Sequence, residues 1–312
     1  MLINDINLVD LKKFSVYNNY MVLEYIVKND KYSVLRQVLK NEFNISNRLL
    51  VKLKKNNCIK VNNEHCYIDF LIKNGDLITV DINFNEESKN IVPTNIPLDI
   101  IYEDDALLII NKPPFLPIHP SHLHFEDTIS NGVQYHFNKI GLKRKIRPVN
   151  RLDKDTSGLV VFAKNEYIQE CLVKQMKSGD FEKEYIAVLE GNIHELTGII
   201  NAPIARKENS IIERCVDNSG DVAVTHYTVL ENSNNYCFVK FKLETGRTHQ
   251  IRVHSRYIGH PILGDTLYGT ASSLINRQAL HAYRIKFIHP ITKERLEFIA
   301  ELPEDIKKLK SK

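Results

Sequence analysis

The sequence lacks the long apolar run that a membrane span requires. No stretch approaches the roughly 18 consecutive apolar residues of a transmembrane helix. The opening segment, MLINDINLVDLKKF (1–14), mixes acids and bases, whereas a signal peptide is basic first and apolar afterwards. We therefore expect a chain that neither carries a signal peptide nor associates with a membrane.

Cysteine is scarce, and no two cysteines stand in a CxxC pair. The five cysteines of the 312-residue chain are scattered, which is typical of free thiols in a reducing compartment. We see no internal repeat and no low-complexity run.

Hydrophobic residues make up 43% and charged residues 26%, which excludes a disordered chain. These values predict a cytoplasmic globular protein with room for two domains.

The chain also has little excess charge, with a net charge of only +4. The positive charge is nevertheless concentrated. Eight Lys/Arg against one acid lie in 31–62, five against none in 141–151, and three against none in 245–264. Three basic segments in a nearly neutral chain indicate a binding site for a polyanion such as RNA. The alternative is that each segment is simply a solvated face.

Residues 1–83 have the pattern of a small α+β domain with an N-terminal extension. Apolar residues recur at helical spacing in two segments, and the second helix should begin at Ser46 or Asn47. Two strand-like runs with turns follow. The helical segments are SVLRQVLKNEF (33–43) and ISNRLLVKLKKNN (45–57), and the strand segments are CIKVNN (58–63) and NGDLITVDI (74–82).

The second predicted helix is basic on its outer face. Two short helices followed by a small hairpin, with this basic second helix, resemble the ribosomal protein S4-like RNA-binding domain over about residues 31–83. The resemblance implies that Arg48, Lys52 and Lys55 contact RNA. The alternative is a helical subdomain whose lysines only keep it soluble.

A polar stretch, NFNEESKNIVPTNIP (83–97), predicts a linker over 84–97. The remainder, 98–312, is rich in strand-like runs, and several of them follow one another through turns rather than helices. Helical patterns occur near 127–140, 166–178 and 247–258. We therefore predict an α+β catalytic domain built on a mixed, mostly antiparallel β-sheet flanked by helices.

The segment RPVNRLDKDTSGLVVFAKN (147–165) places acids and bases directly before a buried strand. Its RLDKDTSGLVVFAK portion resembles the signature of the RluA family of pseudouridine synthases. Three further motifs resemble that family in the same order, and together the four cover about residues 98–302. They are EDDALLIINKPPFLPIHP (103–120), KEYIAVLEG (183–191) and TGRTHQIRVHSRYIGHPILGD (245–265).

The resemblance implies an enzyme that isomerises uridine in RNA to pseudouridine, with Asp153 as the catalytic carboxylate. Changing the glycosidic bond from N1 to C5 involves no redox step, so we expect no cofactor and no metal. A carboxylate can act as nucleophile or base and be regenerated, and both routes stay open. The resemblance assigns Arg252 to hold and ionise Asp153, and Tyr185 to stack on the target base.

Further site residues follow from the same motifs. Arg151 is the family's candidate for filling the gap left by a flipped uridine. We expect Lys112, Lys183, Arg247 and His249 to contact RNA phosphate or organise the site. Many family members carry histidine before the Arg-Leu-Asp turn, and Asn150 stands there instead. An amide can replace part of a histidine's polar contacts, so this departure affects target handling and not the reaction.

Each of these residues also has a structural reading. Asp153 and Asp155 could form or cap a turn, Tyr185 could be a core residue, and Arg252 could belong to a structural ion pair.

Two different functions are also open. His119, His122 and His124 with Glu126 and Asp127 could form a metal site of a hydrolase, although no HExxH spacing is present. A non-catalytic RNA-binding assembly factor would explain the basic segments alone.

The motifs do not specify the RNA substrate. We favour ribosomal RNA, because an S4-like module before this catalytic domain is common among family members that act on ribosomal RNA. Transfer RNA is the alternative. We expect the protein to act as a monomer.

Overall fold

The structure is a computed structural model that describes residues 21–28, 31–86, 88, 90–233 and 235–310. The segments predicted as an N-terminal extension and as free of a signal peptide therefore lie largely outside the described residues. The chain divides into two compact units. One is 1–85 with 103–107, and the other is 86–102 with 108–312. None of the helices in the described part of the chain has the length and apolar character needed to cross a membrane.

The first unit is a four-stranded antiparallel sheet accompanied by two helices. Apolar side chains of both helices and of the central strand are fully buried, among them Leu39, Leu53 and Ile78. The strand order is β1-β4-β2-β3, with β1 (Val22–Ile26), β4 (Leu77–Asp81), β2 (Ile59–Val61) and β3 (Glu64–His65), and the helices are α1 (Leu35–Asn41) and α2 (Asn47–Lys55).

The start of α2 agrees with the expectation from the sequence. Ser46 precedes the helix in an extended conformation, and its hydroxyl accepts a hydrogen bond from the Leu49 backbone N–H at 3.1 Å. This bond satisfies one of the N–H groups that a helix leaves unpaired at its first turn. Leu49 and Leu53 face the core, while Arg48 and Lys55 are exposed. The basic face therefore points away from this unit's core.

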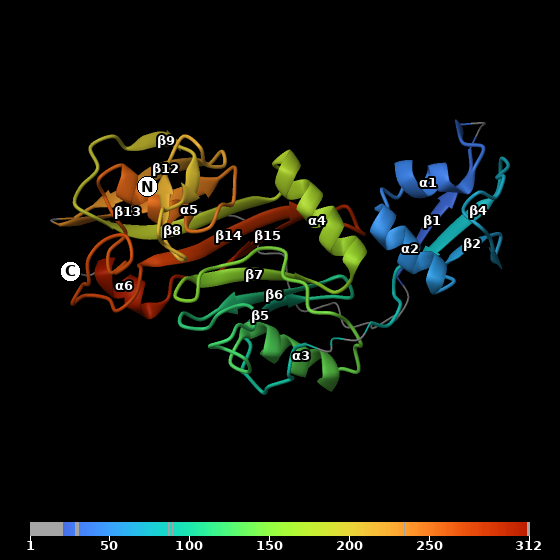
Figure 1. Ribbon diagram of the computed structural model, residues 1–312, viewed down its shortest axis with the longest axis horizontal. Helices are drawn as coiled ribbons and strands as arrows, with labels where there is room; N and C mark the ends of the chain where they lie inside the picture. The colour runs from blue at the N-terminus through green and yellow to red at the C-terminus, as the bar shows by residue number, and fades with distance from the viewer. Residues whose placement is uncertain (1–20, 29–30, 87, 89, 234, 311–312) are drawn as a thin grey trace, which may run out of the picture. The chain divides into compact units, whose positions relative to one another are not determined.

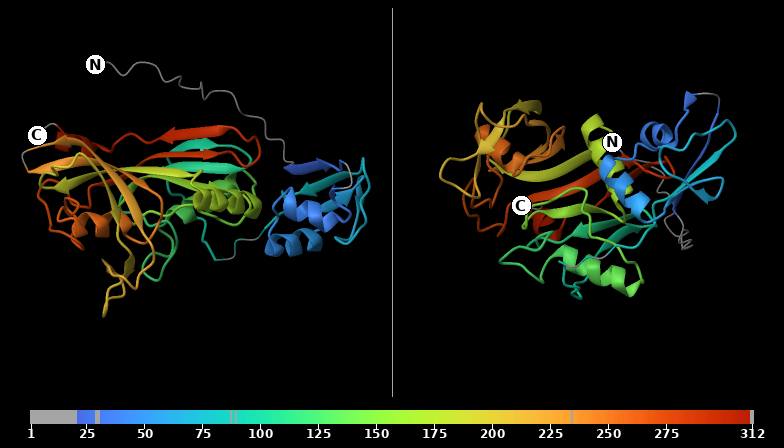
Figure 2. Two further views of the ribbon diagram at one scale, coloured as in Figure 1. Left: turned by 90° about the horizontal axis from the view of Figure 1, so that it is seen from above. Right: turned by 45° about the vertical axis from the view of Figure 1, so that its right-hand side comes forward.

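The second unit is built on one nine-stranded twisted sheet (Figure 1 and Figure 2). It is mixed and mostly antiparallel, and β7 runs parallel to β14. Its order is β5-β6-β7-β14-β8-β13-β12-β9, with β15 on β14; the strands are β5 (Ile100–Glu103), β6 (Leu107–Lys112), β7 (Ser157–Ala163), β14 (Leu280–Ile288), β8 (Glu182–Glu190), β13 (Tyr236–Leu243), β12 (Val224–Asn232), β9 (Thr197–Asn201) and β15 (Arg295–Ile299).

Four helices and a separate hairpin complete this unit. Helix α3 (Ile129–Lys139) shares a core with β6 and β7, and α4 (Glu166–Ser178) packs against β7 and β14. Because helices cover β7, all seven of its residues are buried, as its continuous apolar run indicates. Helix α5 (Gln250–Tyr257) contacts β12 and the hairpin strand β11 (Arg214–Val216), which pairs with β10 (Ile204–Arg206); α6 (Glu304–Lys310) ends the described chain. The predicted α+β class is confirmed.

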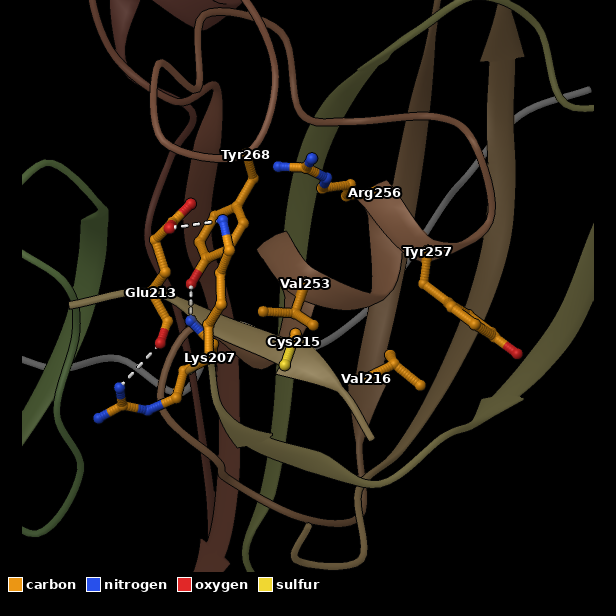
Figure 3. A pocket seen from close by; sticks show the side chains of 9 residues that line it. Lys207, Glu213, Cys215, Val216, Val253, Arg256, Tyr257 and Tyr268 are labelled. Atoms are coloured by element: carbon orange, nitrogen blue, oxygen red, sulfur yellow. Dashed lines mark hydrogen bonds and ion pairs between the residues drawn. The ribbon is translucent and has the colours of Figure 1, made fainter. Parts of the chain in front are cut away.

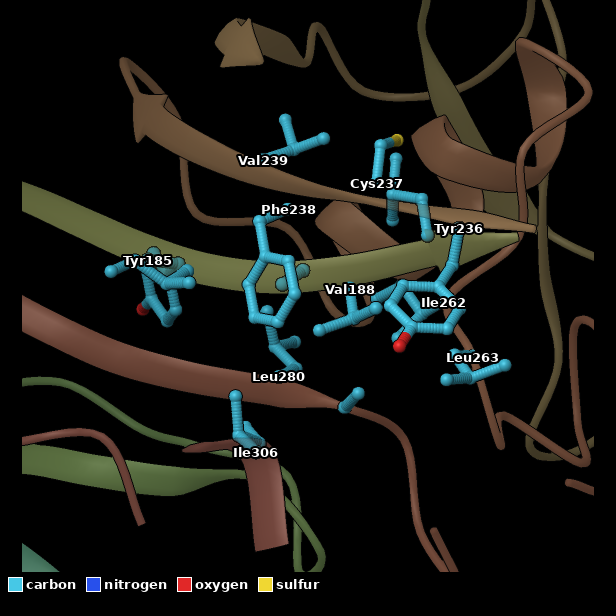
Figure 4. Close-up of a cluster of buried hydrophobic side chains, with 14 of the residues drawn as sticks. Tyr185, Val188, Tyr236, Cys237, Phe238, Val239, Ile262, Leu263, Leu280 and Ile306 are labelled. Carbon is cyan, nitrogen blue, oxygen red and sulfur yellow. The ribbon is translucent and has the colours of Figure 1, made fainter. Parts of the chain in front are cut away.

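The main core of this unit is formed by side chains of the neighbouring strands β8, β13 and β14. Val188, Phe238 and Leu280 belong to it, and Tyr185 lies on β8 at one end of the cluster (Figure 4). Side chains of α5 and α6, such as Ile251 and Ile306, close the cluster. The core therefore fixes β8 and α5, which both carry predicted site residues.

The polar stretch predicted as a linker is attached to the second unit. The Glu86 carboxylate lies 2.7 Å from the buried Arg147 guanidinium, and the Thr94 backbone N–H donates to the Asn131 carbonyl of α3 at 3.2 Å. Ile91 packs against the core of α3. Glu86, Ile91 and Thr94 of this stretch therefore pack against the second unit.

The parallel pair of β7 and β14 requires a glycine. Gly158 lies opposite Ala282 with φ of +111°, and a Cβ at this position would lie 2.2 Å from the Ala282 carbonyl oxygen. An L side chain is therefore excluded by both the backbone conformation and the approach of β14. The strand before which Asp153 stands can pair with β14 only if residue 158 is glycine.

We predict that Gly158→Ala lowers the free energy of unfolding by at least about 2 kcal/mol, because it combines overpacking with a positive φ. Gly179→Ala is the matched control. Gly179 has φ of +87°, but no atom lies within 4 Å of the place that a Cβ would take, so only the backbone penalty of about 1 kcal/mol applies. Urea unfolding monitored by circular dichroism measures both. Equal effects of the two substitutions would contradict the close-approach explanation.

Candidate active site

Asp153 stands in a turn whose backbone is held by buried cations. The Thr156 backbone N–H donates to the Asp153 carbonyl at 3.1 Å and closes the turn. The Lys112 ammonium donates to the Lys154 carbonyl at 2.8 Å, and the Arg277 guanidinium donates to the Asp155 carbonyl at 3.1 Å. Two neighbouring carbonyl groups of one turn are thus each fixed by a charged donor, which leaves the turn little freedom.

Lys112 was expected to contact RNA or organise the site, and the structure supports only the second role. Its side chain is fully buried, and its Nζ donates to the carbonyls of Pro113, Leu116 and Lys154 at 2.8–2.9 Å. Burial lowers the pKa of Lys112 to about 7, while three carbonyl acceptors for three N–H groups favour the ammonium form. A side chain enclosed in this way cannot reach a phosphate.

Arg252 on α5 joins two carboxylates. Its Nε and Nη2 donate to the two oxygens of the buried Asp265 at 2.6 and 2.8 Å. Its Nη1 donates to Asp153 Oδ2 at 3.0 Å. The planar fork of a guanidinium allows this division, because its donors point in fixed and different directions. Asp265 therefore orients Arg252, and Arg252 in turn orients Asp153.

The electrostatics of this group favour the charged form of Arg252. Burial works against the charge of Arg252, but its hydrogen bonds and attraction to Asp265 and Asp153 raise its pKa above the ordinary value. Two carboxylates share one guanidinium, so the arginine only partly neutralises Asp153. Asp153 is also the more exposed of the two carboxylates, at 27% against 0% for Asp265. Asp153 is thus the carboxylate that a substrate can reach.

Tyr185 lies beside this carboxylate on β8. Its side chain is almost wholly buried, at 7% exposure. Burial, and then the negative charge of Asp153, raise the pKa of its hydroxyl well above the ordinary value. The hydroxyl therefore stays protonated at neutral pH. Although Tyr185 belongs to the core, as its structural reading suggested, it also lines the cavity at Asp153.

His249 is the fourth polar side chain at the carboxylate. Its Nε2 lies 3.8 Å from Asp153 Oδ1, the oxygen that Arg252 does not bind. Its Nδ1 lies 2.8 Å from the Tyr268 hydroxyl. Burial lowers the pKa of His249 below its ordinary value, partly opposed by the charge of Asp153. The imidazole is therefore neutral near pH 7.

A small cavity at Asp153 opens beside a large groove. The cavity has about 60 Å³, and Tyr185, His249 and Arg252 contribute to its wall. The groove has about 1100 Å³ and includes Asp153 itself, which is enough space for several nucleotides of an extended strand. The other predicted residues along the groove are Asn150, Arg151, Lys183 and Arg247, and the further basic residues are Lys177 and Lys242.

The basic residues of the groove differ in their surroundings. Arg151 is exposed at the turn before Asp153. Arg247 is held by its Nε–H bond to the Val222 carbonyl at 2.9 Å. Burial removes water from the Lys183 ammonium and thereby lowers its pKa. An anion that binds this ammonium therefore has few water molecules to displace. All three of these basic side chains line the groove.

Asn150 performs a structural task. Its side-chain amide accepts a hydrogen bond from the Val161 N–H at 2.9 Å and donates to the Leu159 carbonyl at 3.0 Å. It thereby fastens the Asp153 turn to strand β7 from the other side. An amide can both donate and accept in this way, which explains why asparagine suits this position.

The sequence motifs did not single out Asp265 and Tyr268. Asp265 closes the last quoted motif, 13 residues after Arg252, yet nothing in that spacing shows that the two side chains meet. Tyr268 lies beside the hairpin of β10 and β11, with its hydroxyl bonded to the Arg214 backbone N–H at 2.8 Å (Figure 3). No local sequence signal identifies Asp265, because its burial and its contact with Arg252 arise only in the folded chain.

Histidines of the 119–127 segment have other partners. His124 pairs with Asp127 at 2.6 Å, and His119 lies 3.1 Å from the Ser130 hydroxyl. Within the ranges that the structure describes, no three His, Cys, Asp or Glu side chains come together in a way that could hold a metal ion. The ligand set weighed from the sequence is therefore not assembled.

Comparison with known proteins identifies the family. The family model described as RNA pseudouridylate synthase matches residues 106–257. The Bacillus subtilis protein named Uncharacterized RNA pseudouridine synthase YjbO is 42% identical over 269 residues, 86% of this chain and 95% of that protein. Ribosomal large subunit pseudouridine synthase D of Vibrio cholerae is 38% identical over 249 residues, 75% of this chain and 76% of that protein.

A solved structure agrees with these relatives. The structure of Human RNA Pseudouridylate Synthase Domain Containing 1 has a TM-score of 0.55 and 27% sequence identity to this chain, and it covers 67% of this chain and 84% of its own. The matched family segment contains the Asp153 turn, Tyr185 and Arg252. The chain therefore belongs to the RluA family of RNA pseudouridine synthases, and it is an isomerase that converts uridine in RNA to pseudouridine.

Proposed function

We propose that this enzyme modifies ribosomal RNA and that Asp153 carries out its chemistry. The observation that carries the proposal is the arrangement of Arg252 between a buried and an accessible carboxylate. Arg252 holds Asp153 through Oδ2 alone, so Oδ1 does not bind the guanidinium, and the Asp153 side chain lines the cavity. Both routes to glycosidic cleavage, attack on the sugar carbon and removal of a sugar proton, need an ionised oxygen in such a position.

Tyr185 and the groove provide the binding that this chemistry requires. A uridine in folded RNA must leave its stack before the carboxylate can reach its sugar. Tyr185 offers a protonated, buried aromatic side chain beside Asp153, against which the uracil can stack. Arg151 lines the cavity, and we propose that it occupies the space that the flipped nucleotide leaves. No redox step occurs, so these protein groups suffice for the isomerisation.

The choice of ribosomal RNA is supported by the relatives. Two of them, from Vibrio cholerae and Haemophilus influenzae, are named ribosomal large subunit pseudouridine synthase D and are 38% and 40% identical to this chain. We propose that the first unit is the S4-like domain that its sequence resembles. The basic outer face of α2 then contacts the RNA and contributes affinity but no chemistry.

Asp153→Asn should abolish the reaction. The amide preserves the volume and one acceptor for Arg252 but removes the negative charge, so the single-turnover rate should fall by at least about a thousandfold. RNA affinity and the circular dichroism spectrum should stay as in the wild type. A purified Asp153→Asn protein that keeps a measurable fraction of the wild-type rate would contradict the assignment.

The same variant tests the RNA substrate in cells. Pseudouridines are mapped in total RNA from a strain without the gene, complemented with the wild-type protein or with Asp153→Asn. We expect one or more ribosomal RNA positions to lose pseudouridine in the strain and to regain it only with the wild-type protein. Loss confined to transfer RNA would overturn the proposed substrate while leaving the role of Asp153 intact.

Arg252→Lys should separate charge from geometry. Lysine keeps the positive charge for Asp265, but a point charge cannot serve two carboxylates through three directed donors. We expect a fold close to the wild type and a single-turnover rate lower by at least about a hundredfold. The control is Lys145→Ala at an exposed base, which should lower the salt slope of RNA binding by about one at most. Equal rate losses at saturating RNA would exclude Arg252 from the site.

The role of α2 can be tested with the basic residues Arg48, Lys52 and Lys55, of which Lys52 is half-buried and the other two are exposed. The triple variant Arg48→Ala/Lys52→Ala/Lys55→Ala should weaken RNA binding and reduce the salt slope by about three, without changing the rate at saturating RNA. Lys307→Ala/Lys308→Ala on α6 is the control for net charge. If both variants weaken binding equally per charge removed, the effect is long-range and α2 is not a specific contact surface.

A further inference from the structure

His249 and Tyr268 form an arrangement that phosphate binding does not require. His249 directly precedes α5 and has φ of 60° and ψ of 19°, a left-handed conformation that a non-glycine residue rarely adopts. Such conformations persist where the surroundings hold them, and they are concentrated at functional sites. The His249 side chain is 13% exposed and is therefore poorly placed to bind a phosphate from the groove.

The Tyr268 hydroxyl determines which nitrogen of His249 carries the proton. Tyr268 is 4% exposed. Among the described residues, its oxygen has two hydrogen-bond neighbours: the Arg214 backbone N–H and His249 Nδ1, each at 2.8 Å. The Arg214 amide can only donate, so the tyrosine hydroxyl directs its own hydrogen to His249 Nδ1. The neutral imidazole then carries its hydrogen on Nε2.

This Nε2–H group faces the reactive carboxylate. It lies 3.8 Å from Asp153 Oδ1, whereas Arg252 binds Oδ2. The separation is longer than a hydrogen bond, and a shift of about 1 Å would form one. Catalytic hydrogen bonds commonly shorten in this way when substrate binds. Arg252 and His249 thus approach the two oxygens of Asp153 from different sides.

We propose that His249 is a positioning residue: Tyr268 keeps the imidazole hydrogen on Nε2, and this N–H group orients the Asp153 oxygen that acts on the ribose. The proposal rests on the role of Asp153 given above. Tyr268 is itself fixed by the Asp265 carboxylate, which accepts from its backbone N–H at 3.2 Å, and by the Arg252 guanidinium 5.0 Å from its ring centroid. The carboxylate that orients Arg252 therefore also places Tyr268.

Acid should disturb this arrangement. Protonation puts a hydrogen on Nδ1, so the Tyr268 hydroxyl must turn its own hydrogen away and accept from this nitrogen. The charged and titratable groups that face His249 are Asp153, Asp265, Arg252, Arg214 and Tyr268. Burial and the two arginines disfavour the imidazolium, and the two carboxylates favour it. Loss of the tyrosine hydroxyl removes a donor that opposes protonation and should raise the pKa of His249.

Three substitutions in the full-length protein test the proposal. His249→Asn tolerates the left-handed backbone and can still pair with Tyr268, but it is too short to reach Asp153. His249→Gln extends an N–H donor to about the position of Nε2. Tyr268→Phe keeps the ring and removes the hydroxyl. Single-turnover rates at saturating RNA and RNA affinities are measured from about pH 5 to pH 8, where histidine titrates.

We expect His249→Asn to lower the saturated rate by about ten- to a hundredfold with unchanged RNA affinity, since one hydrogen bond to a charged group is lost. His249→Gln should recover most of that rate and lose its dependence on histidine protonation. Tyr268→Phe should move the acidic fall in rate to higher pH. The control is His226→Asn on β12, which should behave as the wild type in rate, affinity and pH profile.

Other outcomes overturn the proposal. Weaker RNA binding with a full saturated rate in His249→Asn would make His249 a phosphate contact. Equal losses in the asparagine and glutamine variants, with an unshifted pH profile in Tyr268→Phe, would make the pair purely structural. An active Asp153→Asn enzyme would instead refute the proposed function, whatever the His249 variants do.

Discussion

One buried guanidinium organises this enzyme. Arg252 binds Asp265 through two donors and Asp153 through a third, so the position of the Asp153 carboxylate is set by an acid that is fully buried. Burying Asp265 without its arginine would cost several kcal/mol, and this links the site to the stability of the fold. Helix α5, the Asp153 turn and the 262–268 loop are held together by this single group.

The sheet supplies the second constraint on the site. Asp153 precedes β7, Tyr185 lies on β8, and the two strands flank β14 in the sheet order. Because β7 is parallel to β14 while β8 is antiparallel to it, the start of β7 and the first half of β8 meet at one place. Lys112 and Arg277 hold this turn by donating hydrogen bonds to its backbone carbonyls. The mixed topology of the sheet therefore brings the Asp153 turn next to Tyr185.

Local patterns in the sequence were sufficient to predict many of the structural elements and several of the site residues. The Ser46 cap, the continuous apolar run of β7 and the strand-rich second half all predicted what the structure has, because each depends on near neighbours in the chain. Asp153, Tyr185 and Arg252 stand in recognisable motifs, and the structure brings them together. Burial was not predictable: Lys112 has the residue type of an RNA contact, yet its ammonium is enclosed by carbonyls. Asp265 and Tyr268 were missed because their partners are distant in sequence or lie behind the site.

The bonds that fix the Asp153 turn also bear on how the enzyme folds. Lys112 reaches a carbonyl 42 residues away, and Arg277 reaches one 122 residues away. Contacts of such sequence separation require most of the chain between them to be ordered, and they form slowly. A partly folded chain can therefore possess helices α3 and α4 without a functional carboxylate. The Asp153 turn has all of these bonds only when the segment that carries Arg277 and β14 has joined the sheet, so a late part of the sequence completes a site whose other residues come earlier.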